Sequence, residues 1–107
     1  MSCQIVFTDT AKTDLREITI SLAEITKDRD LTIRFIQELR KTTEILKEFP
    51  ESGSIPRDRV LKSNEYRFLT YKDYLIFYLY EKENNTAYVM SVFNGKRDYM
   101  RVMKKFL

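Results

Sequence analysis

Hydrophobic residues recur at helical spacing through the first part of the chain. After a short apolar run at 4–7, apolar positions separated alternately by four and three residues predict one buried stripe on a helix. They are Ala11, Leu15, Ile18, Leu22 and Ile25. Thr8, Asp9 and Thr10 are candidate N-caps because their side-chain oxygens accept hydrogen bonds from a first helical turn. The pattern predicts a strand over 4–7 followed by an amphipathic helix.

A second helical pattern follows the polar residues 28–30, which interrupt the first. Its apolar positions are Phe35, Ile36, Leu39, Leu46 and Phe49. Pro50 ends it, because proline has no amide hydrogen to donate within a helix. The two helices and their short connection predict an antiparallel helical hairpin. Residues 51–63 show no period, which predicts a loop with a short extended piece at most.

Beyond residue 65 the period changes to two, as is typical of β-strands. Two sets of side chains alternate in three stretches, at 66–71, 74–80 and 87–93. Lys72-Asp73 and Glu83-Asn84-Asn85 are suited to the tight turns between them. These stretches predict a three-stranded antiparallel meander.

Asn94-Gly95 ends the last stretch, and 96–106 predicts a short helix. Its inward-facing residues are expected to be Tyr99, Val102, Met103 and Phe106. The element order predicts an α+β fold in which an N-terminal strand and helical hairpin pack on a small, mainly antiparallel sheet. The other sheet face is expected to stay partly open, bordered by a basic loop and the C-terminal helix.

Composition narrows the range of functions. A chain of 107 residues with two glycines and two prolines predicts a single ordered domain over 1–107. No apolar run approaches the roughly 20 residues that span a bilayer, so we expect a cytoplasmic protein with no membrane partner. Cys3 is the only cysteine, which excludes an internal disulfide. The absence of histidine excludes His/Cys zinc sites, a Ser-His-Asp triad and a paired-histidine ribonuclease, and we expect neither a metal nor a cofactor.

Positive charge is concentrated in the second half of the chain. Residues 8–51 carry eight basic and ten acidic side chains. In contrast, 57–72 carries five basic against two acidic residues, and 96–107 carries five against one. If the fold joins these segments, they form a surface that attracts phosphate or an acidic protein segment. The alternative is two separate solvated faces.

Four segments in this order resemble the RelE/ParE superfamily of bacterial type II toxins. They are 49–53 (FPESG), 66–69 (YRFL), 74–78 (YLIFY) and 92–98 (VFNGKRD). The resemblance covers essentially the whole chain and implies a growth-arresting toxin with a cognate acidic antitoxin as partner. Some relatives cut messenger RNA on the ribosome, whereas the ParE branch poisons DNA gyrase, so the fold alone leaves both targets open.

Metal-free RNA cleavage needs a base for the ribose 2′-OH, cations for the phosphate and an acid for the leaving oxygen. Without histidine, the candidate catalytic residues are basic or tyrosine side chains. Arg67 and Arg97 are candidates to hold the phosphate, because a guanidinium binds it with two parallel hydrogen bonds. Lys62 and Lys96 are candidate bases or phosphate anchors, and Tyr99 is a candidate proton donor.

Each candidate also has a structural interpretation. Arg67 is suited to an exposed strand position, Arg97 to a salt bridge with Asp98, and the lysines to an ordinary surface. Tyr74, Tyr78 and Tyr99 are either platforms for unstacked bases or packing residues.

Three positions depart from the RNA-cleaving pattern. Leu75 stands where such relatives commonly have arginine, Asn94 where many superfamily members have histidine, and Met103 where a tyrosine is expected. Three hypotheses therefore remain: a ribosome-dependent mRNA endonuclease, a non-enzymatic inhibitor of gyrase, and a non-toxic RNA- or protein-binding domain of the same fold.

Overall fold

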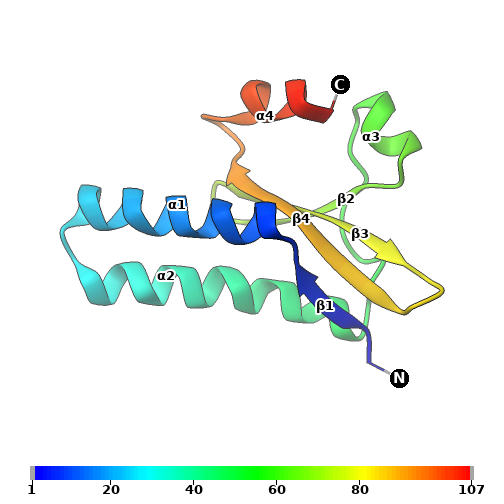
Figure 1. Ribbon diagram of the computed structural model, residues 1–107, viewed down its shortest axis with the longest axis horizontal. Helices are drawn as coiled ribbons and strands as arrows, with labels where there is room; N and C mark the ends of the chain where they lie inside the picture. Colours follow the sequence, from blue (N-terminus) through cyan, green and yellow to red (C-terminus); the bar gives the residue numbers. More distant parts are fainter. Residues whose placement is uncertain (1, 107) are drawn as a thin grey trace.

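The computed structural model describes residues 2–106, without the side chains of Met100, Met103, Lys105 and Phe106. Nine helices and strands occur in this part of the chain (Figure 1). In order they are β1 (Gln4–Phe7), α1 (Asp9–Thr26), α2 (Arg29–Thr42), the 3₁₀ helix η1 (Thr43–Lys47), α3 (Arg59–Ser63), β2 (Arg67–Tyr71), β3 (Tyr74–Glu81), β4 (Thr86–Asn94) and α4 (Tyr99–Phe106). The α+β architecture predicted from the sequence is confirmed.

The four strands form one sheet in the order β1-β4-β3-β2. Strands β2, β3 and β4 make the predicted antiparallel meander, whereas β1 pairs with β4 in parallel. The register places Gln4 opposite Thr86 and Arg67 opposite Tyr78. An irregularity between Phe77 and Tyr78 shifts the β3–β4 pairing by one residue. The parallel partner of β1 could not be read from local periodicity.

The helical hairpin covers one face of the sheet, and both of its helices begin at the predicted polar residues. Thr8 caps α1 by accepting a hydrogen bond from the Ala11 amide, and Asp28 caps α2 by accepting one from the Leu31 amide. The shared core on this face includes Leu15, Ile18, Leu39, Tyr74, Ile76, Val89 and Val92.

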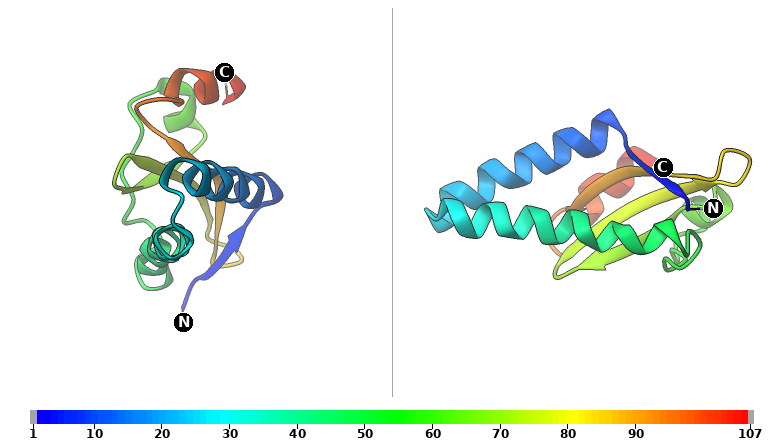
Figure 2. Two further views of the ribbon diagram at one scale, coloured as in Figure 1. Left: turned by 90° about the vertical axis from the view of Figure 1, so that its left-hand side faces the viewer. Right: turned by 90° about the horizontal axis from the view of Figure 1, so that it is seen from below.

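Two apolar residues of the predicted helical stripes are exposed. Ile25 leaves 70% of its surface accessible, because the far end of the hairpin extends past the sheet (Figure 2). Phe49 is 58% exposed, because the helix tightens into η1 after Thr42 and ends at Lys47, so the 3.6-residue period no longer applies. The prediction that these two side chains are buried is wrong.

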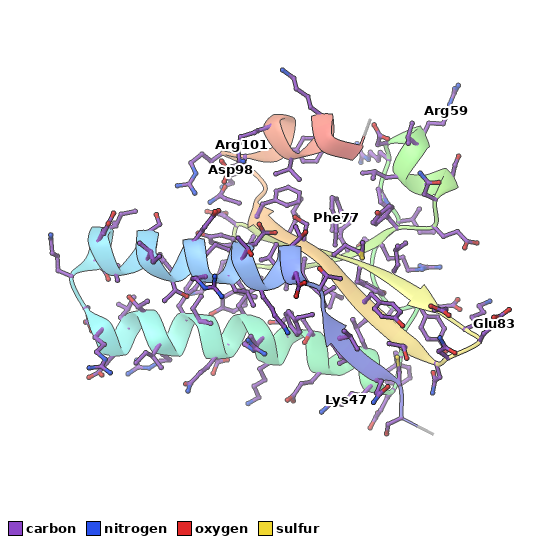
Figure 3. The ribbon with its side chains drawn as sticks, in the orientation of Figure 1. Lys47, Arg59, Phe77, Glu83, Asp98 and Arg101 are labelled. Atoms are coloured by element: carbon purple, nitrogen blue, oxygen red, sulfur yellow. The ribbon has the colours of Figure 1, made fainter. Side chains whose placement is uncertain are left out.

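Helices α3 and α4 cover the second face of the sheet, which was predicted to be partly open. Leu61 and Val102 from these helices pack with Phe77 and Phe93. The Phe77 side chain lies on the side of the sheet that faces α3 and α4 (Figure 3). Helix α3 was missed because it is short; Asp58 caps it by accepting hydrogen bonds from two successive amides. Val102 is buried as predicted, whereas Tyr99 is 37% exposed and does not face the core. Predictions for Met103 and Phe106 lie outside the described side chains.

Candidate functional site

Two of the five candidate catalytic residues line one groove, called here the Arg67 groove. Lys62 from α3 and Arg67 from β2 border a depression with a volume of about 620 Å³. Its remaining lining residues are Glu51, Ile55, Glu65, Tyr66, Tyr80, Glu81, Lys82 and Glu83. The groove therefore carries both positive side chains (Lys62, Arg67 and Lys82) and four carboxylates, so its surface is of mixed charge and not uniformly basic.

Arg67 is held by the segment that precedes α3. Its Nη1 donates to the Gly53 carbonyl oxygen at 3.1 Å, and its Nη2 lies 4.0 Å from a carboxylate oxygen of Glu51. Only 27% of the side chain is accessible. The interpretation of Arg67 as a freely exposed strand arginine is therefore wrong.

Tyr78 supports this arrangement from inside the protein. Its hydroxyl oxygen accepts a hydrogen bond of 2.9 Å from the Gly53 amide, and its side chain is fully buried beside Cys3 and Leu46. Burial raises the pKa of the Tyr78 phenol above its usual value, although the Gly53 hydrogen bond and the nearby Arg67 charge oppose the shift. A Cβ atom on Gly53 would lie 2.6 Å from the Tyr78 ring and hydroxyl, so this position has room only for glycine.

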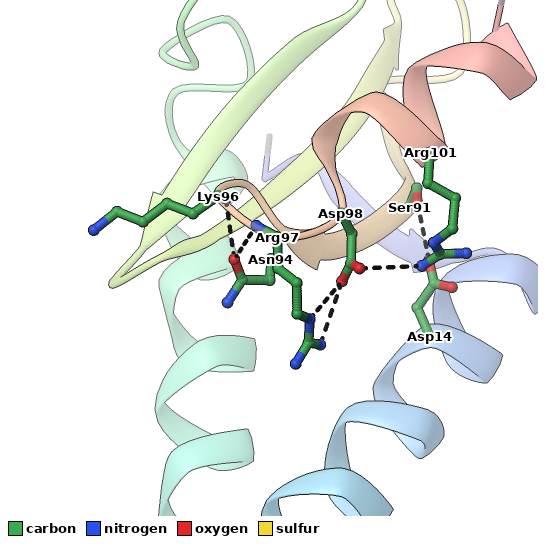
Figure 4. Close-up of polar contacts among 7 residues, drawn as sticks. All are labelled: Asp14, Ser91, Asn94, Lys96, Arg97, Asp98 and Arg101. Carbon is green, nitrogen blue, oxygen red and sulfur yellow. Dashed lines mark hydrogen bonds and ion pairs between the residues drawn. The ribbon is translucent and has the colours of Figure 1, made fainter.

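Arg97 lies in a different groove, called here the α1–α4 groove. This depression has a volume of about 890 Å³ and is lined by residues of α1, β4 and α4. Asp98 forms ion pairs with Arg97 at 3.3 Å and Arg101 at 3.7 Å (Figure 4). Asp14 and Glu17 of α1 contribute to the lining. The predicted Arg97–Asp98 salt bridge is confirmed.

The turn before α4 sets the direction of both basic side chains of the Gly-Lys-Arg segment. The Asn94 side-chain oxygen accepts hydrogen bonds from the amides of Lys96 and Arg97 at 3.0 and 2.9 Å. The Lys96 side chain then extends away from Arg97, and its Nζ lies 3.2 Å from Asp73 in the β2–β3 turn (Figure 4). Asn94 therefore has a structural role in this turn.

Asp14 fixes α1 to the sheet, a role that the sequence analysis missed. Its Oδ2 accepts hydrogen bonds from the Ser91 hydroxyl and the Val92 amide, both at 2.9 Å. These contacts occur where β4 has passed beyond the end of β1. A polar residue on the edge of the buried stripe of α1 was the available signal, but its partners lie 77 and 78 positions away.

The candidate residues therefore form two groups. Arg67 begins β2, whereas the Lys96 side chain reaches Asp73 just beyond the end of that strand. At the usual rise of a strand, these points lie roughly 13 Å or more apart. Strand alternation also places Arg67 on the face that carries Leu69 and Tyr71, which pack under the helical hairpin.

The predicted aromatic platforms are largely absent. Tyr74 is 9% and Tyr78 0% exposed, so both are packing residues and no base has access to either ring. Tyr99 remains accessible on α4. Leu75 packs with the cluster under α3 and α4.

Comparison with known proteins assigns the chain to a family. Residues 5–99 match the model described as the ParE toxin of the type II toxin–antitoxin system parDE. The chain belongs to the ParE toxin family. This assignment confirms the RelE/ParE superfamily resemblance seen in the sequence. No curated protein matched this ParE-family chain.

Solved structures similar to this ParE-family chain come from both branches of the superfamily. A chain from the chromosomal ParDE system of P. aeruginosa has a TM-score of 0.71 at 13% identity, over 87% of this chain and 96% of that one. A chain from the Mycobacterium tuberculosis toxin–antitoxin complex RelBE2 gives 0.66 at 18%, over 88% and 92%. A mutant E. coli toxin RelE in the free state gives 0.62 at 16%, over 100% of both chains. At these identities the likeness shows the fold.

No helix in the described residues combines the length and apolar character needed to cross a membrane. Within 2–106, no three Cys, Asp or Glu side chains gather as potential metal ligands.

Proposed function

We propose that this type II toxin arrests bacterial growth by binding DNA gyrase and that it cuts no RNA itself. The observation that carries the proposal is the separation of the candidate catalytic cations. Lys62 and Arg67 line one groove, Arg97 lines another, and Lys96 lines neither but pairs with Asp73. The family match supports it, because the resemblance associates the ParE branch with gyrase. A cognate acidic antitoxin is the partner that neutralises the toxin.

Cleavage of RNA depends on convergence of its catalytic groups. The base must lie within about 3 Å of the 2′-OH proton, and cations must contact the same phosphate. In this chain Lys62 and Arg67 lie in one groove and Arg97 in another. Arg67, Arg97 and Lys96 also each have a carboxylate within 4.0 Å. A protein that inhibits its target by binding needs only a complementary surface. The separation of these cations therefore argues against the nuclease hypothesis and not against the gyrase hypothesis.

Ribosome-dependent mRNA cleavage is the second candidate. It is favoured by the presence of Lys62, Arg67 and an aromatic ring, that of Tyr66, in a single groove. In this hypothesis Arg67 and Arg97 hold the phosphate, and Lys62 or Lys96 and Tyr99 transfer protons. It requires closure of the two grooves around the RNA.

Two assays on the purified toxin separate the candidates. Added to a gyrase supercoiling reaction, the toxin is expected to abolish supercoiling; added to a translating extract, it is expected to leave mRNA intact. Cut mRNA with normal supercoiling would overturn the proposal. The Lys62→Ala and Arg67→Ala variants sharpen the test, since loss of a catalytic group lowers a cleavage rate by roughly 100-fold or more.

Growth arrest in cells tests the contribution of Arg97. Its side chain is 61% accessible and belongs to the basic segment 96–105. We expect Arg97→Ala to abolish arrest because it removes a cation from the surface that contacts the target. Lys12→Ala, an exposed cation on α1, is the matched control. Undiminished arrest by Arg97→Ala at equal expression would contradict this role.

A further inference from the structure

Helices α3 and α4 lie side by side over the second face of the sheet (Figure 1). They bring the basic segments 57–63 and 98–104 together, because Leu61 of α3 and Val102 of α4 pack into the same apolar cluster. The exposed cations of these segments, called here the α3–α4 face, are Arg57, Arg59, Lys62, Arg101 and Lys104. The fold therefore joins two basic segments whose contact the sequence alone did not establish.

Helical geometry directs two of these cations away from the sheet. Successive residues of a helix are separated by about 100° around its axis, so side chains two positions apart lie roughly 160° apart. Arg59 stands two positions before the buried Leu61, and Lys104 two positions after the buried Val102. The Arg59 side chain points away from the sheet (Figure 3). Arg59 and Lys104 therefore extend from the same outer side of the protein.

The carboxylates within these segments leave most of the positive charge unneutralised. Asp58 accepts hydrogen bonds from two amides at the start of α3. The Asp98 side chain is 18% accessible and pairs with Arg97 and Arg101. Among the residues that the structure describes, the other four cations of the face form no ion pair. The face therefore keeps a positive charge that a polyanion can neutralise.

The side chains of this face favour a duplex over a single strand. Single strands bind by stacking successive bases on exposed aromatic rings. Phe77 and Phe93 beneath the two helices are buried, and Tyr99 is the accessible ring among the described side chains of α3 and α4. Outward-pointing arginines and lysines, in contrast, contact phosphates without reading bases. Duplex DNA also carries one charge per about 1.7 Å, roughly twice the density of a fully acidic extended peptide.

We propose that the α3–α4 face binds the phosphate backbone of duplex DNA. Arg59 and Lys104 contact phosphates directly, and the other cations of the face add to the attraction. Because no bases are read, binding has no sequence preference. A toxin bound to gyrase then also contacts the DNA on which gyrase acts. This second role rests on the proposed function, whereas the DNA contact itself does not.

Fluorescence anisotropy of a short labelled duplex, titrated with the intact toxin, tests the contact without gyrase. About four phosphate contacts predict that the logarithm of the association constant falls with the logarithm of salt concentration at a slope of roughly −3.6. Affinity should therefore drop roughly 100-fold between about 50 and 200 mM salt. No binding at low salt, or equal competition by poly-glutamate or by single-stranded DNA, would overturn the proposal.

Charge-reversal variants locate the contact. Arg59→Glu and Lys104→Glu should each weaken binding by roughly tenfold at low salt, and Arg59→Gln should reduce the size of the salt slope by about one. Arg34→Glu is the matched control, because Arg34 is exposed on α2 and the change alters the net charge equally. Equal weakening by Arg34→Glu would overturn the proposal, because net charge and not this face would then attract the DNA.

A gyrase supercoiling reaction separates the DNA contact from the proposed function. We expect the double variant Arg59→Glu/Lys104→Glu to need roughly tenfold more toxin for inhibition than the natural protein. Inhibition at an unchanged concentration would overturn the role of this face beside gyrase. If the natural toxin binds the duplex but leaves supercoiling intact, the proposed function fails and the DNA contact stands.

Discussion

Replacement of Tyr78 by phenylalanine tests how the segment under Arg67 is held. The change removes one oxygen atom and leaves the buried ring in place. That oxygen accepts the 2.9 Å hydrogen bond from the Gly53 amide, and Gly53 is itself buried. An amide donor left without a partner in the interior costs about 1–3 kcal/mol. We therefore expect Tyr78→Phe to lower the free energy of unfolding by roughly 2 kcal/mol.

Urea denaturation followed by circular dichroism measures this difference. For a chain of this size, 1 kcal/mol corresponds to a shift of roughly 4–8 °C in Tm, so thermal unfolding provides a second measurement. Tyr80→Phe is the matched control, because its hydroxyl donates to a half-buried side chain, that of Asn85 in the turn between β3 and β4. A loss below about 0.5 kcal/mol for Tyr78→Phe would refute the reasoning, since the Gly53 amide would then have found another partner.

The natural protein and Tyr78→Phe should also differ in how their free energies of unfolding depend on pH in the alkaline range. Burial raises the pKa of the folded Tyr78 phenol above its ordinary value of 10.0. The neutral phenol is therefore favoured in the folded state, and its contribution to stability is complete below pH 10 and is lost as the pH rises through the raised pKa. Above about pH 10 the natural protein should lose stability more steeply than Tyr78→Phe. Parallel stability curves over this range would contradict the assignment.

Three further substitutions test separate contacts. Gly53→Ala should cost about 1–3 kcal/mol in the free energy of unfolding, because the new Cβ would lie 2.6 Å from Tyr78. Asp14→Ala should cost a similar amount, since the Val92 amide loses its 2.9 Å acceptor; calorimetry measures both. Leu75→Arg should yield mRNA cleavage in a translating extract if a missing cation limits the chemistry, and intact mRNA would reject that explanation.

Most of the fold could be predicted from the sequence because its elements have strong local signals. Strand β1 has the predicted bounds, α1 begins after Thr8, and the β2–β3 hairpin turns at Lys72-Asp73. Helix α3 escaped notice because five residues hold too little periodicity to distinguish them from a loop. The coverage of the second sheet face depends on long-range contacts between Leu61, Phe77 and Phe93, which a local pattern does not encode.

The candidate site was less predictable, because residues that share a chemistry need not share a surface. The alternation of side chains places Arg67 and Tyr78 on one face of the sheet, and this relation was available from the strand pattern. The direction of the Arg97 side chain could not be predicted in this way, since it depends on the turn that Asn94 stabilises. A catalytic role of the separated cations stays a prediction, which the gyrase supercoiling reaction and the translating extract test.

The pairing of β1 with β4 joins a segment that is synthesised early in translation to one that is synthesised late. The Thr8 hydroxyl and the carbonyl of Val89 are 81 positions apart in the chain, yet they lie 2.8 Å apart. Contacts of such long range form late in folding, after the intervening segment has left the ribosome. An unfinished chain that lacks β4 has no strand with which β1 can pair, so this side of the sheet forms only after residues 86–94 have been synthesised.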